Sequence, residues 1–304
     1  MIRAVFQFAG DTEQAAPVPP AGITLERDTD APAGRLELTF ESGAALFGRE
    51  PCGVRLERGG TVLFTGVIDE HRICLEGGAR EELFSLRSRV ALLQDSEAEP
   101  GTLRMPSLRL MEQRFLSPFG MKAEDGDFSP KQGEMIVEKG TSCWNALCAF
   151  SERFLRCTPY GTRAGNLRFA ARTPKRLRLQ AVRSIEYSYR PEMQISRVVV
   201  QSTRTGAYSA VFENDAAEIP RMRYRAAQEG QSPREIIEAG EQGAFGVRVV
   251  CGGFVDAEPG DVCDFSGLGS AYRHMRLTGM QYRLVRGMEE TELRFERGGT
   301  EGEG

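Results

Sequence analysis

The sequence predicts a mainly β protein in which two β domains, each a sandwich or a barrel, flank a small α+β domain. In residues 1–99 and again in residues 182–297, polar and apolar side chains alternate along short segments, as they do in half-buried strands. Glycine pairs and a Pro-Gly pair separate these segments, which is typical of the tight turns of a sandwich or barrel. In residues 100–181 the apolar spacing becomes helical.

The N-terminal domain is expected to be built from hairpins. Leu36, Leu38 and Phe40 fall on one face of a strand. Gly59-Gly60 and Gly77-Gly78 predict turns, because glycine tolerates the positive φ that tight hairpins require. The segment after the first pair is apolar on both faces, so we expect a central strand there. The expected strands cover residues 35–40, 54–56, 61–68 and 82–87.

The α+β domain is expected to contain two helices and a strand over residues 167–170. Ser107 can cap the first helix, because its hydroxyl can accept a hydrogen bond from an amide of the first turn, and Pro118 and Gly120 end it. Thr141-Ser142 can cap the second helix. The apolar stripe of the second helix comprises Trp144, Leu147, Cys148, Phe154 and Leu155. Trp144 is expected to anchor the core rather than to stack on a ligand.

The C-terminal domain carries a strong helix signal within its strands. Ser232-Pro233-Arg234-Glu235 is a capping box with proline at the first helical position, which predicts a helix over residues 233–242. Pro259-Gly260 predicts a type II turn. Leu293 and Phe295 are expected to face the core. The expected strands cover residues 195–201, 208–212, 247–251, 262–265, 275–284 and 291–295, and residues 298–304 are expected to form a disordered tail.

Composition narrows the classes of protein. Hydrophobic residues make up 40% and charged residues 27% of the 304 positions, which is ordinary for a globular protein. A net charge of −4 argues against nucleic-acid binding driven by overall charge. No apolar run reaches the roughly 20 residues that cross a bilayer, and no signal peptide is expected. His71 and His274 are the two histidines, so histidine-rich metal sites are disfavoured.

Two short motifs resemble a dinucleotide-binding loop and a metal site, but each is better explained as a structural feature. Gly267-Leu268-Gly269 lacks the third glycine of a dinucleotide-binding loop, so a hairpin loop is expected. Cys143, Cys148 and Cys157 lie close in sequence, but positions five apart on a helix diverge, so buried thiols are expected rather than metal ligands.

The acidic pairs and His71 are also interpreted as structural or solvent-exposed residues rather than as catalytic groups. His71 follows Asp69-Glu70 with no nucleophile motif nearby, so a solvated strand end is expected. Glu289-Glu290 and the pair Glu97 and Glu99 are expected to be exposed loop charges rather than glycosidase carboxylates. We therefore predict no catalytic residue, no metal and no cofactor.

One charge pattern departs from the average. Between Arg153 and Arg204 there are twelve lysines and arginines and only two acids. Two explanations fit this excess of basic residues equally well. It forms either a solvated basic face or a docking face for an acidic partner protein or for DNA passing nearby. The hypothesis of a subunit or partner interface rests on Arg163, Arg168, Arg172, Lys175, Arg176, Arg178 and Arg183.

Five segments, in order along the chain, resemble phage tail hub proteins. Residues 62–69 are similar to the family's LFTGxVxD strand, and residues 85–100 to its strand-to-linker segment. Residues 108–121 resemble its helix that ends in PYG, and residues 138–154 its KGxSxWxVLxxF helix. Pro259-Gly260-Asp261 resembles the start of its closing barrel. The family is the contractile-tail baseplate hub: the late control protein D type, the Mu-like hub, and relatives in tailocins and injection systems.

The resemblance implies a structural role without chemistry. Such hubs are homotrimers with two tail-tube-like barrels per chain, so three chains present six barrels to a six-fold tube and match a three-fold spike. Its implied partners are the tail tube, spike, tape-measure, LysM-type tail and baseplate wedge proteins, with DNA at most passing through the lumen. The implied location is the baseplate of a virion or tail-like particle, after assembly in the bacterial cytoplasm.

Two other functions remain open. A β-sandwich that binds carbohydrate or another surface is disfavoured by an aromatic content of 8% with one tryptophan, since stacking platforms are then scarce. A hub enzyme that degrades cell wall is disfavoured because the three regions use the whole length and no catalytic motif is visible.

Overall fold

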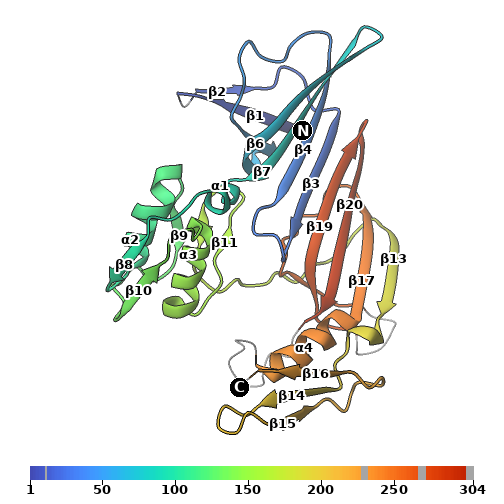
Figure 1. Cartoon of the computed structure of the whole chain (residues 1–304). Coiled ribbons are helices and arrows are strands. Elements are labelled where there is room, and N and C mark those ends of the chain that lie inside the picture. Colours follow the sequence, from blue (N-terminus) through green and yellow to red (C-terminus); the bar gives the residue numbers. More distant parts are fainter. Residues whose placement is uncertain (11, 227–231, 266–271, 299–304) are drawn as a thin grey trace. The chain divides into compact units, whose positions relative to one another are not determined.

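The computed structural model describes residues 1–10, 12–226, 232–265 and 272–298. The fold is mainly β, with mostly antiparallel strand pairs and a few helices, which confirms the predicted fold class (Figure 1). The chain forms two compact units. The first comprises Met1–Thr173 with Gln281–Glu289, and the second comprises Pro174–Met280 with Glu290–Gly304. A hairpin near the C-terminus therefore contributes its tip to the first unit.

The first unit contains an antiparallel sheet with the strand order β3-β4-β7-β6-β5-β1-β2. The strands are β1 (Ile2–Phe8), β2 (Thr12–Ala15), β3 (Gly22–Asp28), β4 (Arg35–Ser42), β5 (Gly53–Arg58), β6 (Thr61–Glu76) and β7 (Ala79–Ser88). As predicted, β6 is central, because it pairs with β5 on one side and β7 on the other. Gly77 and Gly78 form the β6–β7 turn with φ of 57° and 84°.

One face of this sheet forms the core of the N-terminal region. Leu36, Leu38 and Phe40 are fully buried, as their alternation predicts. The Phe6 ring centroid lies 5.8 Å from that of Phe40 and 4.9 Å from that of Phe84, in tilted arrangements that aromatic pairs favour.

In the α+β part of the first unit, both helices begin where the sequence predicts, and the first helix also ends where predicted. The Ser107 hydroxyl accepts a hydrogen bond from the Leu110 N–H at 3.2 Å, and the Ser142 hydroxyl accepts one from the Asn145 N–H at 3.1 Å. Gly120 ends the first helix with φ of 63°. The elements are α1 (Val90–Asp95), β8 (Gly101–Arg104), α2 (Leu108–Met111), the π-helical turn η1 (Glu112–Leu116), the 3-10 turn η2 (Ser117–Phe119), β9 (Ala123–Asp125), β10 (Glu134–Val137), α3 (Cys143–Phe150), the π-helical turn η3 (Ser151–Leu155), β11 (Tyr160–Gly161) and β12 (Leu167–Arg168).

A second apolar core lies among these helices. Trp144 is partly buried and packs against this core, as expected of an anchor. Cys143 is buried as predicted, but the prediction is wrong for Cys148 and Cys157, which are only partly covered. Burial raises the pKa of the Cys148 thiol to about 11, so it stays protonated at neutral pH.

The second unit contains a sheet with the order β13-β17-β20-β19, with β18 paired to β19, and a separate sheet with the order β15-β14-β16. Leu293 and Phe295 of β20 are buried, as predicted. The strands are β13 (Val182–Tyr189), β14 (Arg197–Gln201), β15 (Tyr208–Glu213), β16 (Met222–Arg225), β17 (Phe245–Gly252), β18 (Val262–Cys263), β19 (Met275–Val285) and β20 (Met288–Arg297). The 3-10 turn η4 (Pro191–Met193) precedes β14.

Helix α4 (Pro233–Ala244) covers one face of the three-stranded sheet. Both bonds of the predicted capping box form: the Ser232 hydroxyl accepts from the Glu235 N–H at 3.1 Å, and the Glu235 carboxylate accepts from the Ser232 N–H at 2.8 Å. Ile236 packs with Ile195 and Val198 in a small apolar cluster. No helix among the described residues is long and apolar enough to cross a membrane.

Two predictions about polar residues are wrong. His71 does not lie at a solvated strand end; its side chain is 15% exposed and contacts Glu50 and Glu82. Glu289 and Glu290 do not lie in an exposed loop, because β20 begins just before them and each forms an ion pair. The expected Gly267-Leu268-Gly269 loop, and the expected tail beyond residue 298, lie outside the described residues.

Candidate functional site: assembly surfaces

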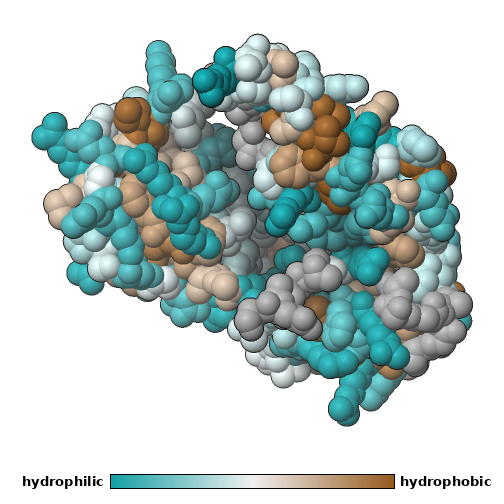
Figure 2. Space-filling view, turned by 90° about the horizontal axis from the view of Figure 1, so that it is seen from below, coloured by the Kyte–Doolittle hydropathy of each residue, from teal (hydrophilic) through white to brown (hydrophobic). Residues whose placement is uncertain are grey.

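In the part of the chain that the structure describes, the features that could contact a partner include an edge strand, a hairpin arm, a sheet face, a small pocket and a run of basic residues. Among the described residues, no group of His, Cys, Asp and Glu side chains is placed to hold a metal ion. Figure 2 shows hydrophobic side chains that reach the surface in small groups between hydrophilic ones. Each feature is described within its own unit.

Strand β13 is the edge of the main sheet in the second unit. It is eight residues long, and among the described strands it pairs only with β17. Val182, Ile185 and Tyr189 are each about two-fifths exposed, at 41%, 42% and 41%. A long edge strand with exposed apolar residues is a template for main-chain pairing with another chain.

The register of β13 shows which backbone groups face outward. The Arg190 N–H donates to the Ala244 carbonyl at 2.7 Å, and Ser188 is paired with Gly246. In an antiparallel pair, hydrogen-bonded residues alternate with residues whose groups point to the other side. The backbone groups of Ile185 and Tyr187 therefore point away from β17 and can bond to an added strand.

The β6–β7 hairpin continues beyond the core as an arm, seen in teal at the top of Figure 1. Ile73 and Leu75 near its turn are 45% and 73% exposed, although both are apolar. Exposed apolar side chains on a two-stranded arm are typical of a contact surface rather than of a solvated loop.

The outer face of the β15-β14-β16 sheet is also apolar. Cross-strand pairing places Val199 beside Val211 and Tyr224, on the side opposite to the α4 cluster. The rings of Tyr208 and Tyr224 meet edge to face with centroids 5.4 Å apart. Arg197 and Glu213 border the face with an ion pair of 2.6 Å.

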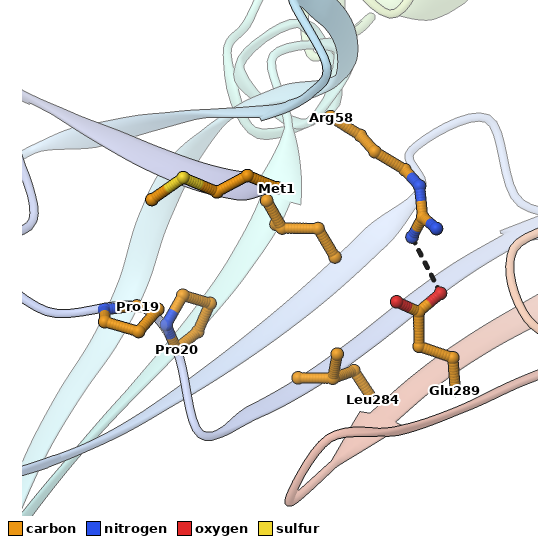
Figure 3. Close-up of a pocket in the computed structure, with 7 residues that line it drawn as sticks. Met1, Pro19, Pro20, Arg58, Leu284 and Glu289 are labelled. Atoms are coloured by element: carbon orange, nitrogen blue, oxygen red, sulfur yellow. Dashed lines mark hydrogen bonds and ion pairs between the residues drawn. The ribbon is translucent and has the colours of Figure 1, made fainter.

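A pocket of about 190 Å³ lies in the first unit (Figure 3). Arg58 and Glu289 point toward one another across it and form an ion pair of 2.7 Å. Arg58 also donates to the Tyr282 hydroxyl at 3.3 Å, and burial raises the pKa of that hydroxyl to about 12. The apolar part of the lining comprises Met1, Ile2, Pro19, Pro20 and Leu284.

The seven basic residues of the predicted interface, from Arg163 to Arg183, are called the basic stretch. They are divided between the two units, and most of their side chains have partners within their own unit. In the first unit, Arg168 lies 3.2 Å from Glu124 and from Asp125. The guanidinium of Arg172 lies 5.4 Å from the ring centroid of Tyr160, and Arg163 is partly buried.

In the second unit, acids from distant parts of the sequence face the basic stretch. Lys175 pairs with Asp256 at 3.5 Å, and Arg183 pairs with Glu290 at 3.4 Å. Arg176 pairs with Asp264. The His274 N–H and the Arg176 guanidinium hold the pKa of the Asp264 carboxyl below its usual value.

Arg178 differs from its neighbours. It is exposed, and no ion pair to it is found among the described residues. It is therefore the residue of the stretch that is most open to an outside acid, whereas the paired arginines would first have to exchange partners.

A charged cluster around Glu82 was missed by sequence reasoning. Glu82 is almost fully buried and accepts hydrogen bonds from the Arg80 guanidinium at 2.7 Å and the Leu46 N–H at 3.0 Å. One signal could have found it: Glu82 alternates with Phe84 and Leu86, so it falls on the core face of β7. A buried carboxylate needs partners, which had to come from elsewhere in the chain.

Solved structures with this fold include phage tail proteins and a component of a type VI secretion system. The 43 kDa tail protein of prophage MuSo2 from Shewanella oneidensis matches with a TM-score of 0.76 at 13% identity, over 97% of this chain and 98% of its own. The tail protein from Neisseria meningitidis MC58 matches with a TM-score of 0.68 at 16% identity, over 97% and 96%.

A third structure is an Escherichia coli component of the type VI secretion system, which itself exhibits structural similarity to the T4 bacteriophage tail proteins gp27 and gp5. It matches with a TM-score of 0.57 at 12% identity, over 94% of this chain and 75% of its own. No protein-family model and no curated protein matches the sequence. The chain thus has a phage tail and baseplate-like fold.

Proposed function

We propose that this chain is the hub of a contractile phage tail or tail-like particle, acting as a homotrimer that adapts a six-fold tail tube to a three-fold spike. The observation that carries the proposal is the match with the MuSo2 tail protein, which covers 97% of one chain and 98% of the other.

Symmetry gives the physical reason for such a hub. A ring of six tube subunits and a spike of three cannot share one set of identical contacts. A trimer whose chain carries two β units presents six of them to the tube while keeping three-fold symmetry for the spike. Two compact β-rich units in this chain support that arrangement.

The partners follow from the same position in a particle. We expect contacts with the tail tube and spike, and further contacts with the tape-measure, LysM-type tail and baseplate wedge proteins. Structural neighbours include chains of PdpA-VgrG complexes, two of them from Francisella, at TM-scores of 0.57 to 0.60, which supports a partner of the spike type. On this proposal the role is structural, and the chain performs no catalysis.

Native mass spectrometry of the purified chain tests the proposal. The expected main species has three times the 33.6 kDa mass of one chain, and co-expression with the spike and tube proteins of the same particle should yield complexes that contain this trimer. A protein that stays monomeric at high concentration and binds neither partner would overturn the proposal. Binding on a glycan array without assembly would favour the carbohydrate-binding alternative.

A further inference from the structure

The loop between β4 and β5, residues 43–52, is fastened onto the sheet of the first unit at several points. Phe47 packs on the rings of Phe6 and Phe8, with centroids 4.7 and 5.3 Å apart. The Leu46 N–H donates to the buried carboxylate of Glu82 at 3.0 Å. The third contact is between the Glu50 carboxylate and the imidazole of His71.

His71 is held between carboxylates from two different elements. Its Nδ1 lies 2.8 Å from Glu50 of the loop, and its Nε2 lies 3.1 Å from Glu82 of β7. The ring stacks on Phe84, its cross-strand partner, with centroids 4.1 Å apart and planes 9° apart. Stacking fixes the ring plane, so both nitrogens stay aimed at carboxylate oxygens.

The other charged groups near His71 leave this arrangement intact. Arg80 of β7 reaches Glu82 from the side opposite to His71, because it bonds to Oε1 while the imidazole faces Oε2. Glu70 and Arg72 are the neighbours of His71 in β6 and pair with each other at 3.2 Å. Successive strand residues point to opposite faces, so this pair lies on the other face of the sheet.

The two carboxylate contacts of His71 determine the protonation state of its ring. A neutral imidazole carries one N–H and one lone pair, so it can donate to one carboxylate only, whereas an imidazolium donates to both. If the ring were neutral, a lone pair would face a carboxylate oxygen at hydrogen-bond distance. Both contacts to His71 can therefore persist together only while the ring is doubly protonated.

We propose that His71 is a pH-sensitive latch that fastens the residue 43–52 loop to the β6–β7 hairpin through Glu50 in mild acid and releases it in mild base. Among side chains, it is ordinarily histidine that changes its charge between about pH 5 and 8. The inference concerns the N-terminal unit alone and holds whatever the chain assembles with.

Burial decides which of the two contacts is released. Glu82 is buried and also bonded to Arg80 and Leu46, so it cannot move away from the ring without losing those partners. The Glu50 side chain is 76% exposed and can turn into water. In the neutral state the proton therefore stays on Nε2, and Glu50 leaves Nδ1.

Hydrogen–deuterium exchange of residues 43–52 at pH 5.5 and pH 8.5 tests the latch. After correction for the intrinsic pH dependence of exchange, we expect protection to fall about two- to fivefold at the higher pH, the range of an exposed ion pair. In Glu50→Gln, the side-chain amide can accept from Nδ1–H or donate to a bare Nδ1, so protection should be equal at both pH values. In Glu50→Ala, protection should be low at both.

Two matched variants isolate His71. Glu70→Gln neutralises an adjacent acid on the other face, and His274→Gln removes the other histidine, so both should keep the wild-type pH dependence. The proposal is overturned if wild-type protection does not change with pH, or if Glu50→Gln keeps the wild-type change. Imidazole nitrogen shifts that place the proton on Nδ1 at pH 8.5 would also overturn it.

Discussion

The ring of Phe64 fills the space that a side chain at Gly66 would need. A Cβ atom on Gly66 would lie 2.7 Å from Phe64 Cζ and would also overlap the Arg87 carbonyl. Both residues lie in the central strand β6, where neighbouring strands leave no room for a shift. We therefore expect Gly66→Ala to lower the free energy of unfolding by about 1–3 kcal/mol, as overpacking of a core does.

Urea unfolding followed by circular dichroism measures the Gly66→Ala effect. Gly43→Ala is the matched control, because a Cβ there meets nothing within 4 Å and the position has no left-handed φ. Its unfolding free energy should stay within about 0.5 kcal/mol of the wild type. Equal losses in the two variants would show that the close approach of Phe64 and Gly66 is not what makes position 66 sensitive.

Removal of the capping hydroxyl should loosen helix α4. Ser232→Ala deletes the acceptor for the Glu235 N–H, and such caps contribute about 1 kcal/mol. Amide exchange over the first turn of α4 should then become about fivefold faster, since that free energy corresponds to this factor at room temperature. Glu238→Gln changes an exposed residue in the same helix and should leave exchange in the first turn unchanged.

The buried carboxylate of Glu82 should make stability depend on pH in the acid range. Burial raises the pKa of Glu82, but hydrogen bonds from Arg80, the Leu46 N–H and His71 outweigh that effect and bring it below its ordinary 4.5. A carboxyl whose folded pKa is depressed stabilises the fold above its unfolded pKa. This stabilisation is lost as the pH falls through the folded value.

Glu82→Gln should therefore flatten the loss of stability below about pH 4.5 and should cost about 1–3 kcal/mol at pH 7, where a charge-assisted bond is replaced by a neutral one. Thermal unfolding between pH 3 and pH 7 measures both effects. Glu81→Gln, at the exposed neighbouring position, should follow the wild-type curve. An unchanged acid dependence in Glu82→Gln would contradict the role assigned to this carboxylate.

Local features were predictable from the sequence because their causes lie within a few residues. Ser232 and Glu235 satisfy one another within one turn, so the capping box is visible in the sequence and forms in the structure. Gly77-Gly78 set the β6–β7 turn in the same way. The strand pattern also placed Leu36 and Leu38 in the core, because alternation needs no knowledge of the partner strand.

Features that depend on distant pairing were not predictable. His71 meets Glu50 and Glu82 only when the register of the hairpin and the path of the residue 43–52 loop are known, and so its burial was missed. The basic stretch looks uncompensated in sequence, but Asp264 and Glu290 lie roughly a hundred residues beyond Arg176 and Arg183, and the fold brings them together.

The edge strand β13 gives a prediction about assembly. Ile185→Pro removes an outward N–H and places proline where an incoming strand would bond, and prolines are tolerated on edge strands when the lost N–H faces solvent. We expect the proposed trimer to dissociate while the fold is kept. Ile185→Thr keeps the N–H and the strand preference, so this variant should assemble as the wild type does.

Native mass spectrometry reads the assembly of both Ile185 variants, and far-ultraviolet circular dichroism confirms that they are folded. If Ile185→Pro unfolds the chain, Ile185→Lys replaces it, since a charge on an edge strand also opposes pairing. An unchanged oligomer in a folded Ile185→Pro protein would show that β13 does not pair with another chain. The assembly contact would then have to lie on another surface.

The basic stretch is best tested at Arg178. Reversing Lys175 or Arg176 would leave Asp256 or Asp264 without its partner, so lost binding could reflect a disturbed fold. Arg178→Glu changes an exposed charge with no such pair among the described residues. If the stretch docks an acidic partner, association of Arg178→Glu with the spike or tube should weaken several-fold at low salt, because like charges then meet at the interface.

The salt dependence of binding and a charge-matched control make the result specific. Arg109→Glu changes the net charge by the same amount at an exposed position outside the stretch, so it should bind as the wild type does. The difference between Arg178→Glu and Arg109→Glu should shrink as salt rises, because a screening length of about 8 Å at physiological ionic strength weakens interactions between exposed charges. If Arg178→Glu binds both partners with wild-type affinity at low salt, the stretch is a solvated basic face.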